Sequence, residues 1–180
     1  MTFSFSMKIP KERVAVLIGT KGESKRAIEA RGKCHLRIDS EEGDVEMTGE
    51  DAILLYTTQE VIKSVARGFN PDIAMNLYKI DYAFDLLNLS DVAKTQSGMQ
   101  RLKGRVIGHE GKARKVIEEL TDCNVSVYGK TISIIGPAER ISIARRSIEM
   151  ILGGSRHGNV YRFLEGQRRK WKRDEMGIGV

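Results

Sequence analysis

The stretch Val16-Leu17-Ile18-Gly19-Thr20-Lys21-Gly22 returns 89 residues later as Arg105-Val106-Ile107-Gly108-His109-Glu110-Gly111. Both copies place a Gly-x-x-Gly tetrapeptide between an aliphatic segment and a basic amphipathic segment. The tetrapeptide alone is weak evidence, because a chain with 18 glycines in 180 residues produces it by chance. The sequence around the tetrapeptides therefore decides whether this is a true repeat.

The surroundings of the two tetrapeptides repeat in charge, in helix period and in strand period. At the offset of 89, the matching pairs are Lys25 with Arg114, Arg26 with Lys115, Ile28 with Ile117, Glu29 with Glu118, Cys34 with Cys123, Leu36 with Val125 and Ile38 with Val127. Shortening the offset by two then aligns Val45-x-Met47-Thr48-Gly49 with Ile132-x-Ile134-Ile135-Gly136. A repeat of this length indicates a tandem duplication of one domain.

Length and composition agree with two small domains. A chain of 180 residues can hold two units of roughly 70 to 90 residues, each with a modest core. No apolar run approaches the ~20 residues that span a membrane, and Met1 to Ser6 lack the features of a secretory signal. We therefore expect a cytoplasmic protein without membrane contacts.

Each repeat contains one cysteine, Cys34 or Cys123, at the same position. The alternation with Leu36 and Ile38 predicts that these thiols face a core, where small buried cysteines are common. The three histidines, His35, His109 and His157, are too dispersed for a metal site. We therefore expect neither a disulfide, nor a bound metal, nor a cofactor.

The first repeat predicts the order strand, helix, Gly-x-x-Gly, helix, strand, strand, helix. Apolar alternation, a first-turn Pro10, a capping Gly32 and an N-terminal Asp51 set the element ends. The predicted ranges are Phe3 to Met7, Pro10 to Ile18, Glu23 to Ala30, Cys34 to Asp39, Val45 to Thr48 and Asp51 to about Gly68. This order matches the type I KH fold, in which three helices cover one face of a three-stranded antiparallel sheet.

The second repeat predicts the same order after a longer lead-in. Its elements are Pro71 to Tyr78 as a linker helix, then Phe84 to Ser90, Gln96 to Ile107, Lys112 to Leu120, Asn124 to Tyr128, Thr131 to Ile135 and Pro137 or Ala138 to Leu152. The fold class is therefore α+β, with two tandem type I KH domains. We expect the first domain at 1–70, a linker helix at 71–83, the second domain at 84–154 and a basic C-terminal extension at 155–180.

Two interpretations of the C-terminal extension remain open. It carries Tyr161, Arg162, Phe163, Arg168, Arg169, Lys170, Trp171, Lys172 and Arg173. Either a short helix around Tyr161 to Leu164 packs on the domain and a charged tail frays after it, or the extension adds a contact to an RNA backbone.

The net charge of +6 is concentrated in the second half of the chain. Residues 1–90 hold 12 Lys and Arg against 14 Asp and Glu, a net charge of −2, whereas residues 91–180 hold 18 against 10, a net charge of +8. This asymmetry predicts that a polyanion binds mainly to the second unit.

The Gly-x-x-Gly turn is suited to a single-stranded RNA backbone. Glycine allows close approach of phosphate and unusual φ angles, and the helix that follows presents free N–H groups and a favourable dipole. A KH unit clamps about four unpaired nucleotides in this way, with the bases across an aliphatic groove.

The candidate RNA-binding residues follow from this chemistry. In the second unit they are Gly108, His109, Glu110 and Gly111 in the turn, with Lys103, Arg105, Ile107, Lys112, Arg114 and Lys115 around it. In the first unit they are Gly19, Thr20, Lys21, Gly22 and Lys25. The aliphatic candidates for the groove wall are Ile107, Val106, Val116 and Val125, of which some must instead belong to the core.

The sequence gives no support for catalysis. It contains no Gly-x-Ser-x-Gly motif and no paired carboxylates, and neither glycine turn has P-loop spacing. The alternatives to a non-catalytic RNA-binding protein are an RNA-binding accessory or catalytic component of an RNA-degrading or RNA-modifying enzyme, and a protein-interaction scaffold that uses the acidic first unit.

Several segments together resemble one family. These are Ile107-Gly108-His109-Glu110-Gly111-Lys112, Ile117-Glu118, Ile132-x-Ile134-Ile135-Gly136 and Ile151-Leu152-Gly153 followed by Val160-Tyr161. They resemble the partner-of-Nob family of small-ribosomal-subunit assembly factors, in a compact archaeal form. The resemblance implies binding near the 3′ end of the small-subunit rRNA precursor, together with the Nob endonuclease that trims that end. Eukaryotic relatives tend to have a degenerate first turn, whereas Gly19-Thr20-Lys21-Gly22 is intact, so the first unit remains a candidate for RNA or for protein.

Overall fold

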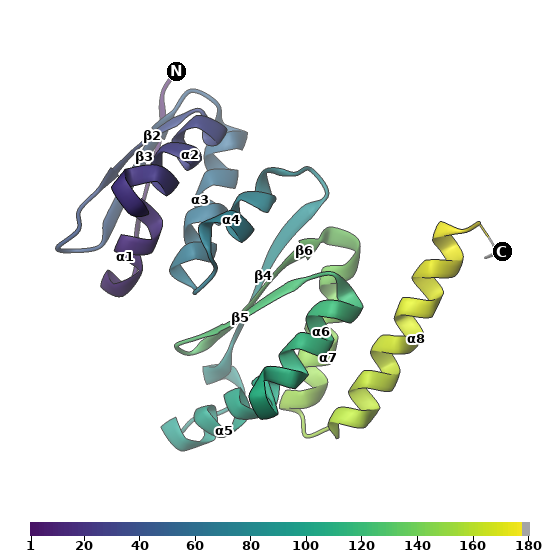
Figure 1. The fold of residues 1–180 in the computed structure, drawn as a ribbon. Coiled ribbons are helices and arrows are strands. Elements are labelled where there is room, and N and C mark those ends of the chain that lie inside the picture. The colour runs from purple at the N-terminus through teal and green to yellow at the C-terminus, as the bar shows by residue number, and fades with distance from the viewer. Residues whose placement is uncertain (178–180) are drawn as a thin grey trace. The chain divides into compact units, whose positions relative to one another are not determined.

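The computed structural model describes residues 1–177 and divides the chain into two compact units (Figure 1). The first unit is Met1–Phe84, and the second begins at Asp85. Each unit has a three-stranded sheet, with the strand order β1-β3-β2 in the first and β4-β6-β5 in the second. The two-domain α+β prediction is confirmed.

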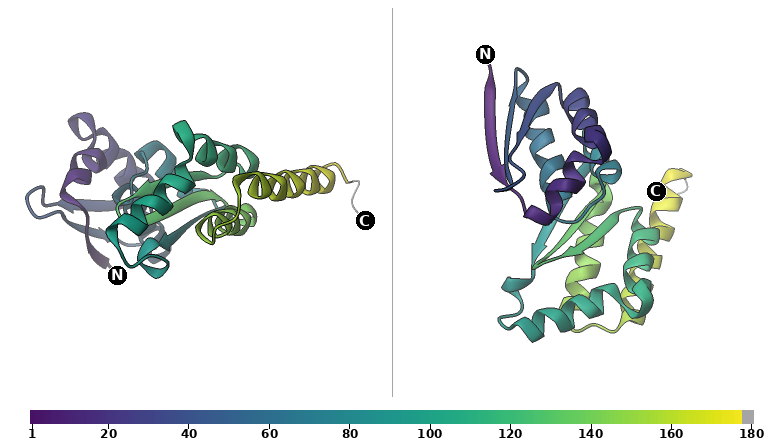
Figure 2. Two further views of the ribbon diagram at one scale, coloured as in Figure 1. Left: turned by 90° about the horizontal axis from the view of Figure 1, so that it is seen from below. Right: turned by 60° about the vertical axis from the view of Figure 1, so that its left-hand side comes forward.

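The first unit contains the elements that the apolar pattern predicts. They are β1 (Phe3–Lys8), α1 (Lys11–Ile18), α2 (Glu23–Gly32), β2 (Cys34–Ile38), β3 (Asp44–Gly49) and α3 (Ala52–Ala66). The central strand β3 pairs antiparallel with both neighbours, and β1 forms an edge of this sheet (Figure 2). Asp51 caps α3, since its Oδ1 accepts hydrogen bonds from the N–H groups of Ile53 and Leu54, both at 3.0 Å.

One face of the first sheet supplies the core and the other is polar. Met47 lies opposite Phe5 and Leu36, so these three side chains share the helix-covered face. The alternate position, Glu46, lies opposite Ser6 and Arg37 on the other face. Met47 and Leu36 are fully buried. The period-two pattern of these strands therefore identifies the core face correctly.

The second unit repeats this order, with β4, α5 and β6 longer than their counterparts in the first unit. They are β4 (Tyr82–Asn88), α5 (Gln96–Ile107), α6 (Lys112–Thr121), β5 (Asn124–Tyr128), β6 (Thr131–Pro137), α7 (Ala138–Leu152) and a further helix, α8 (His157–Glu175). The strand β4 begins two residues before the predicted Phe84. Cys123 is buried as expected, and desolvation raises its pKa to about 11. Cys34 is only half-buried, and desolvation again raises its pKa.

Residues 71–78 of the expected linker helix pack on the first unit, and β4 already begins at Tyr82. They form a short α4 (Pro71–Ala74) and a 3₁₀ turn, η2 (Met75–Tyr78), and both pack against α3. The Tyr78 hydroxyl lies 2.8 Å from Thr58 Oγ1 on α3, and burial raises the pKa of Tyr78 to about 12. Sequence periodicity could not reveal this anchor, because it depends on a contact 20 residues away.

Gly32 is a packing residue and not the predicted cap of α2. Lys33 occupies the left-handed cap position, with φ 47°, and Gly32 is the last helical residue. A Cβ on Gly32 would lie 2.8 Å from the Tyr78 hydroxyl oxygen, so only glycine leaves room for that anchor. The sequence identified a special glycine at this position but assigned it the wrong role.

The C-terminal extension is an ordered helix as far as Glu175, and it packs against α6 and α7 (Figure 2). Val160 and Leu164 on its inner side are fully buried. Arg140 of α7 binds the carboxylates of Asp122 and Glu175, and it stacks 4.9 Å from the centre of the Trp171 ring. The predicted fraying after Leu164 is therefore wrong, because ionic contacts continue where the apolar stripe ends. No helix of residues 1–177 is long and apolar enough to cross a membrane.

Replacing Arg140 with Gln is expected to loosen the second half of α8 without unfolding the unit. The Arg140 side chain is only 11% exposed and holds two carboxylates, an arrangement that contributes about 2 kcal/mol. Amide hydrogen exchange of residues 168–175 should accelerate about tenfold. Arg101→Gln, at an exposed position of α5, is the matched control and should leave this exchange unchanged. Unchanged protection in Arg140→Gln would contradict the docking role.

Candidate nucleic-acid interface

The two Gly-x-x-Gly turns have nearly identical backbone conformations. In the first, Gly19 has φ 75° and ψ 174°, and Gly22 has φ 76°. In the second, Gly108 has φ 77° and ψ 176°, and Gly111 has φ 76°. In each turn the amide of the second glycine donates to the carbonyl of the first, at 3.1 and 3.2 Å. The repeat read from the sequence is therefore a repeat of local geometry.

The two glycines of each turn have different functions. The first has φ and ψ angles that are essentially restricted to glycine. A Cβ on Gly108 would lie 2.7 Å from the amide nitrogen of Ala113, and one on Gly19 would lie 2.9 Å from that of Ser24. The first glycine thus lets the following helix approach the turn. At Gly111 an added Cβ would meet no atom within 4 Å, so this glycine leaves an open surface.

The residues between the glycines point into solvent. The side chains of His109 and Glu110 are 92% and 86% exposed, with His109 Nε2 3.8 Å from Glu110 Oε1. Glu110 has φ 52°, as does its counterpart Lys21 at 54°, which turns the backbone sharply between the two helices. Thr20 and Lys21 are likewise exposed. Both turns are therefore accessible to a ligand along their backbone.

Cations surround the second turn. Lys112, Arg114 and Lys115 are exposed on the first turn of α6, and Lys103 is half-exposed on α5. Between them Ala113 is buried, which fixes the orientation of α6 and directs its neighbours outward. Among the described residues none of these four cations forms an ion pair. The structure therefore places free positive charge around this turn.

The first turn has a weaker set of cations. Lys25 is half-exposed on α2. Arg26 is turned back on the turn itself, since its Nη1 donates to the Lys21 carbonyl at 2.6 Å. This contact stabilises the turn but occupies one of its cations, so the first unit offers less free positive charge.

Arg105, predicted as a phosphate partner, is engaged within the unit instead of standing free beside the turn. Its Nη2 donates to the Ser155 carbonyl at 2.7 Å, and its Nη1 donates to the Ile151 carbonyl. These carbonyls belong to the end of α7 and the segment after it. Arg13 of α1 binds the carbonyls of Val65 and Phe69 in the same way, at 2.8 and 2.9 Å. In each unit, an arginine before the turn therefore holds the end of the third helix.

The aliphatic candidates divide between groove and core. Ile107 and Val116 are half-exposed and can form a groove wall beside the turn. Val106 and Val125 are 0% and 3% exposed, so they belong to the core. The sequence pattern could not separate the groove residues from the core residues. Neighbours such as Val106 and Ile107 are both aliphatic, and only the rotation of the helix decides which one is buried.

Each unit contains one glutamate, Glu29 or Glu118, whose role the sequence did not reveal. Glu118 Oε1 accepts from the Val125 amide at 2.9 Å, and Glu29 Oε1 accepts from the Leu36 amide at 2.8 Å. Each carboxylate ties the helix after the turn to the edge strand of its sheet. The only sequence signal was that Glu29 and Glu118 occupy matching positions in the repeat.

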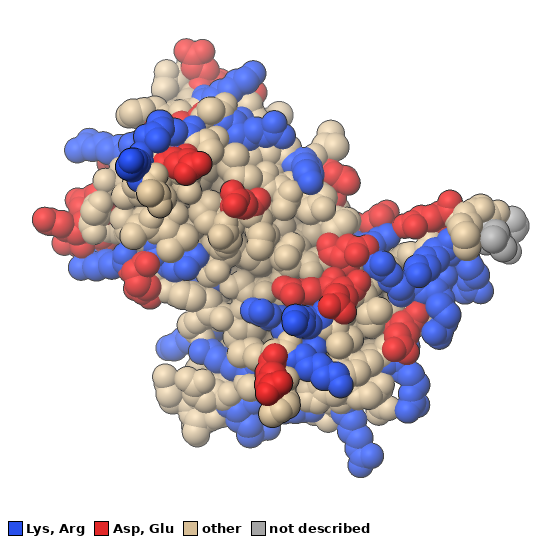
Figure 3. Space-filling model, viewed as in Figure 1, with Lys and Arg blue, Asp and Glu red and all other residues tan. Residues whose placement is uncertain are grey.

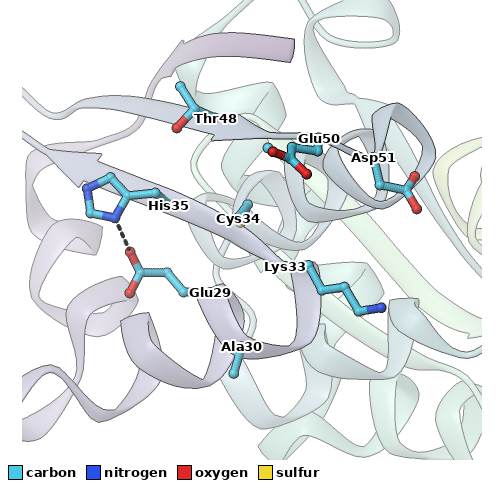
Figure 4. Close-up of a pocket in the computed structure, with 9 residues that line it drawn as sticks. Glu29, Ala30, Lys33, Cys34, His35, Thr48, Glu50 and Asp51 are labelled. Atoms are coloured by element: carbon cyan, nitrogen blue, oxygen red, sulfur yellow. Dashed lines mark ion pairs between the residues drawn. The ribbon is translucent and has the colours of Figure 1, made fainter. Parts of the chain in front are cut away.

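The first unit also has an open hollow of about 600 Å³ at the far end of α2 from its glycine turn (Figure 4). His35 Nδ1 lies 3.4 Å from Glu29 Oε1 at this hollow, and Glu50 and Asp51 line the other side. Its three carboxylates disfavour phosphate. In residues 1–177 no group of three or more His, Cys, Asp or Glu side chains is placed to hold a metal ion.

Alanine substitutions should separate the roles of Gly108 and Gly111. Gly108→Ala should lower the free energy of unfolding by about 3 kcal/mol through backbone strain and the clash at Ala113. Gly111→Ala should cost only about 1 kcal/mol, because only its left-handed conformation is penalised. Urea denaturation measures both values. Gly104→Ala, in the open interior of α5, is the control and should stabilise slightly. Equal losses at the two turn positions would contradict the assignment.

Arg105 and Lys103 should behave oppositely when each is changed to Gln. Arg105→Gln should lower the free energy of unfolding by about 2 kcal/mol, because two carbonyls lose a charged donor. It should leave the salt dependence of RNA binding unchanged. Lys103→Gln should keep stability and reduce the slope of log affinity against log salt by about 0.7. A reduced salt slope in Arg105→Gln would restore Arg105 as a phosphate contact.

Comparison with known proteins agrees with this geometry. Residues 83–169 match the model of the Eukaryotic type KH-domain (KH-domain type I) in its second-domain Pno1 form, and residues 4–66 match the KH domain model. The KH domain-containing protein MJ0443 of Methanocaldococcus jannaschii is 43% identical over 93% of this chain and 75% of its own length. The pre-rRNA-processing protein PNO1 of Chaetomium thermophilum is 28% identical over 73% of this chain, which spans 54% of that protein.

Two solved structures are also similar. The crystal structure of Dim2p from Pyrococcus horikoshii OT3 has 41% identity and a TM-score of 0.85, covering 91% of this chain and 98% of that one. A chain in the a/eIF2alpha–aDim2p–rRNA complex from the same organism has 40% identity and a TM-score of 0.87, covering 94% and 96%. With two KH domains along the same length and identities of about 40%, this chain belongs to the Dim2/Pno1 family of tandem KH-domain proteins.

Proposed function

We propose that this protein is a non-catalytic RNA-binding factor that acts in assembly of the small ribosomal subunit. The ligand that it binds is a single-stranded stretch of rRNA. The observation that carries the proposal is the second glycine turn, whose open Gly111 surface lies among four unpaired cations. The aDim2p chain of similar sequence was solved in a complex with rRNA, which supports the same ligand class here.

The second unit is the main clamp in this proposal. Its turn has Lys112, Arg114 and Lys115 directly after it, whereas Arg26 in the first unit is bound to its own turn. The negative Glu110 does not oppose phosphate, because its exposed carboxylate lies beside His109 while the backbone faces the ligand. The first unit, with its intact turn and net acidic half, takes a weaker RNA contact or a protein contact.

The rRNA segment bound is the 3′ region of the small-subunit precursor. This finer assignment rests on the resemblance to the partner-of-Nob family and on the pre-rRNA-processing role in the printed name of the Chaetomium relative. In that setting the protein would present the 3′ end to the Nob endonuclease, a protein partner, and would not cut RNA itself. Cytoplasmic localisation follows from the same proposal.

Changing His109 and Glu110 together to Asp tests the clamp. The double variant adds a carboxylate at position 109 and brings the one at position 110 closer to the backbone that faces the phosphate, so affinity for a single-stranded RNA from the rRNA 3′ end should fall about tenfold or more. Because both side chains are exposed, the free energy of unfolding should not change. Fluorescence anisotropy with the labelled RNA measures the affinity.

The corresponding change of Thr20 and Lys21 to Asp tests the first unit, and it lowers the net charge by three, against one in the second unit. It should weaken binding less than the change in the second unit. Unchanged affinity in the His109 and Glu110 double variant would show that the second turn is not the clamp. Incubation of the purified protein with the same RNA should shift its mobility without shortening it, and cleavage products that depend on the protein would favour the enzyme alternative.

A further inference from the structure

The inner side of α8 docks this helix on the rest of the second unit. Val160 and Leu164 are buried, and Arg168, Trp171 and Glu175 continue the same stripe at helical spacing. Arg168 Nη1 binds Asp122 Oδ2 at 2.8 Å, and Glu175 Oε1 accepts from Arg140 Nη2 at 2.7 Å. Asp122 and Glu175 are therefore bound by arginines of the docked side, whereas Glu165 and Asp174 of α8 are exposed.

The outer side of α8 carries a line of free cations. Arg162, Arg169 and Arg173 lie along the face opposite the docked stripe, with Lys170 and Lys172 on either side, and all five are exposed. We call these five residues the arginine face. None of them forms an ion pair within the described part of the chain. From Arg162 to Arg173 the face extends about 16 Å along the helix axis, and Figure 3 shows the Lys and Arg side chains gathered on α8.

A glycine within the same face indicates that a partner approaches closely. Gly166 lies between Arg162 and Arg169, and a Cβ there would meet only Arg169 Nη2 at 3.9 Å. Glycine in a helix interior is about 1 kcal/mol less favourable than alanine, and nothing within the unit requires it. Gly158, on the same side of the first turn, likewise has no atom within 4 Å of an added Cβ. Small residues at these positions allow a bulky backbone to lie on the helix.

The helix α8, which carries the arginine face, starts near the glycine turn. His157 Nε2, at the beginning of α8, lies 2.7 Å from the carbonyl oxygen of Arg105, which is three residues before Gly108. Farther along, Arg168 contacts Asp122 at the end of α6. Since α6 begins immediately after the turn, α8 runs in the same direction as α6. An RNA held at the turn can therefore continue along α8.

We propose that the arginine face binds the phosphate backbone of double-stranded RNA adjoining the single strand held at the second glycine turn. The rings of Trp171 and Phe163 are each engaged by an arginine of α7, Arg140 or Arg146, at 4.9 and 5.4 Å. The exposed side chains of the face are all cationic, which favours contacts to phosphates. A rigid line of arginines suits a regular duplex, which proteins recognise by shape and backbone. The proposal rests on the proposed function for the single-stranded part only.

The test compares two RNA probes of identical single-stranded sequence. One is the 3′-end oligonucleotide alone, and the other carries it as an overhang on a hairpin stem. The wild-type protein should bind the overhang hairpin at least tenfold more tightly. The variant Arg162→Gln, Arg169→Gln, Arg173→Gln should bind both probes equally, at the wild-type affinity for the single strand. On the hairpin its salt slope should fall by about 2 to 3, because up to three phosphate contacts are lost.

Matched variants separate the possible failures. Lys8→Gln, Lys11→Gln, Arg37→Gln removes the same charge from exposed positions of the first unit and should keep the preference for the hairpin. The His109 and Glu110 double Asp variant should lose the single strand but retain residual binding to the stem. If that variant binds normally while the arginine variant loses the hairpin preference, the proposed clamp fails and the arginine face stands. Equal wild-type affinity for the two probes, or an equal loss on both in the arginine variant, overturns the arginine face.

Gly166→Ala gives an independent readout. Alanine should raise the midpoint of thermal unfolding, because it removes the cost of a helical glycine. The same methyl group should weaken hairpin binding about threefold or more by keeping the backbone away, with single-strand affinity unchanged. Stabilisation without any loss of hairpin binding would contradict a close approach at this point.

Discussion

The close approach of a helix to the turn before it is the constraint on which the candidate interface depends. Ala113 and Ser24 occupy the space that a Cβ on Gly108 or Gly19 would need, and the backbone there adopts angles that essentially only glycine accepts. This contact fixes the angle between the two helices that flank each turn. It also directs the amide groups of the turn and the cations of α6 to the same side. The open surface at Gly111 therefore depends on Gly108, which allows the turn and α6 to adopt this arrangement.

In the second unit, two arginines also hold the helices that pack behind the turn. Arg105 holds the end of α7, and Arg140 holds α8 through Asp122, Glu175 and Trp171. These arginines are partly buried and occupied, whereas Arg114, Arg169 and Arg173 are exposed and free. The strongly basic character of this half of the chain thus has two origins, one structural and one available to a polyanion. Net charge alone cannot divide the arginines between these two roles.

The sequence predicted most of the fold, because the repeat let each half confirm the other. The bounds of α5 and β5 were predicted to the residue, and those of the other strands and helices of the two KH repeats within two residues, whereas α8 extends well beyond the predicted Tyr161 to Leu164. The errors arose where a tertiary contact decides the outcome: Gly32 packs against Tyr78, and the segment 71–78 docks on α3. At the candidate site the sequence located both turns and the lysines around the second one, but it did not show that Arg105 is engaged within the unit. Its partners are carbonyls 46 and 50 residues away, and carbonyls carry no sequence signal.

The glutamate that links helix to strand in each unit has a consequence for self-association. The strands β2 and β5 are sheet edges, and exposed edges can recruit a strand from another chain. Glu29 and Glu118 already occupy one edge amide each, at Leu36 and Val125. An incoming strand would have to displace a carboxylate and would find a negative charge beside its own carbonyl oxygens. The side chain that ties helix to strand in each unit thereby also disfavours pairing of this edge with a strand of another chain.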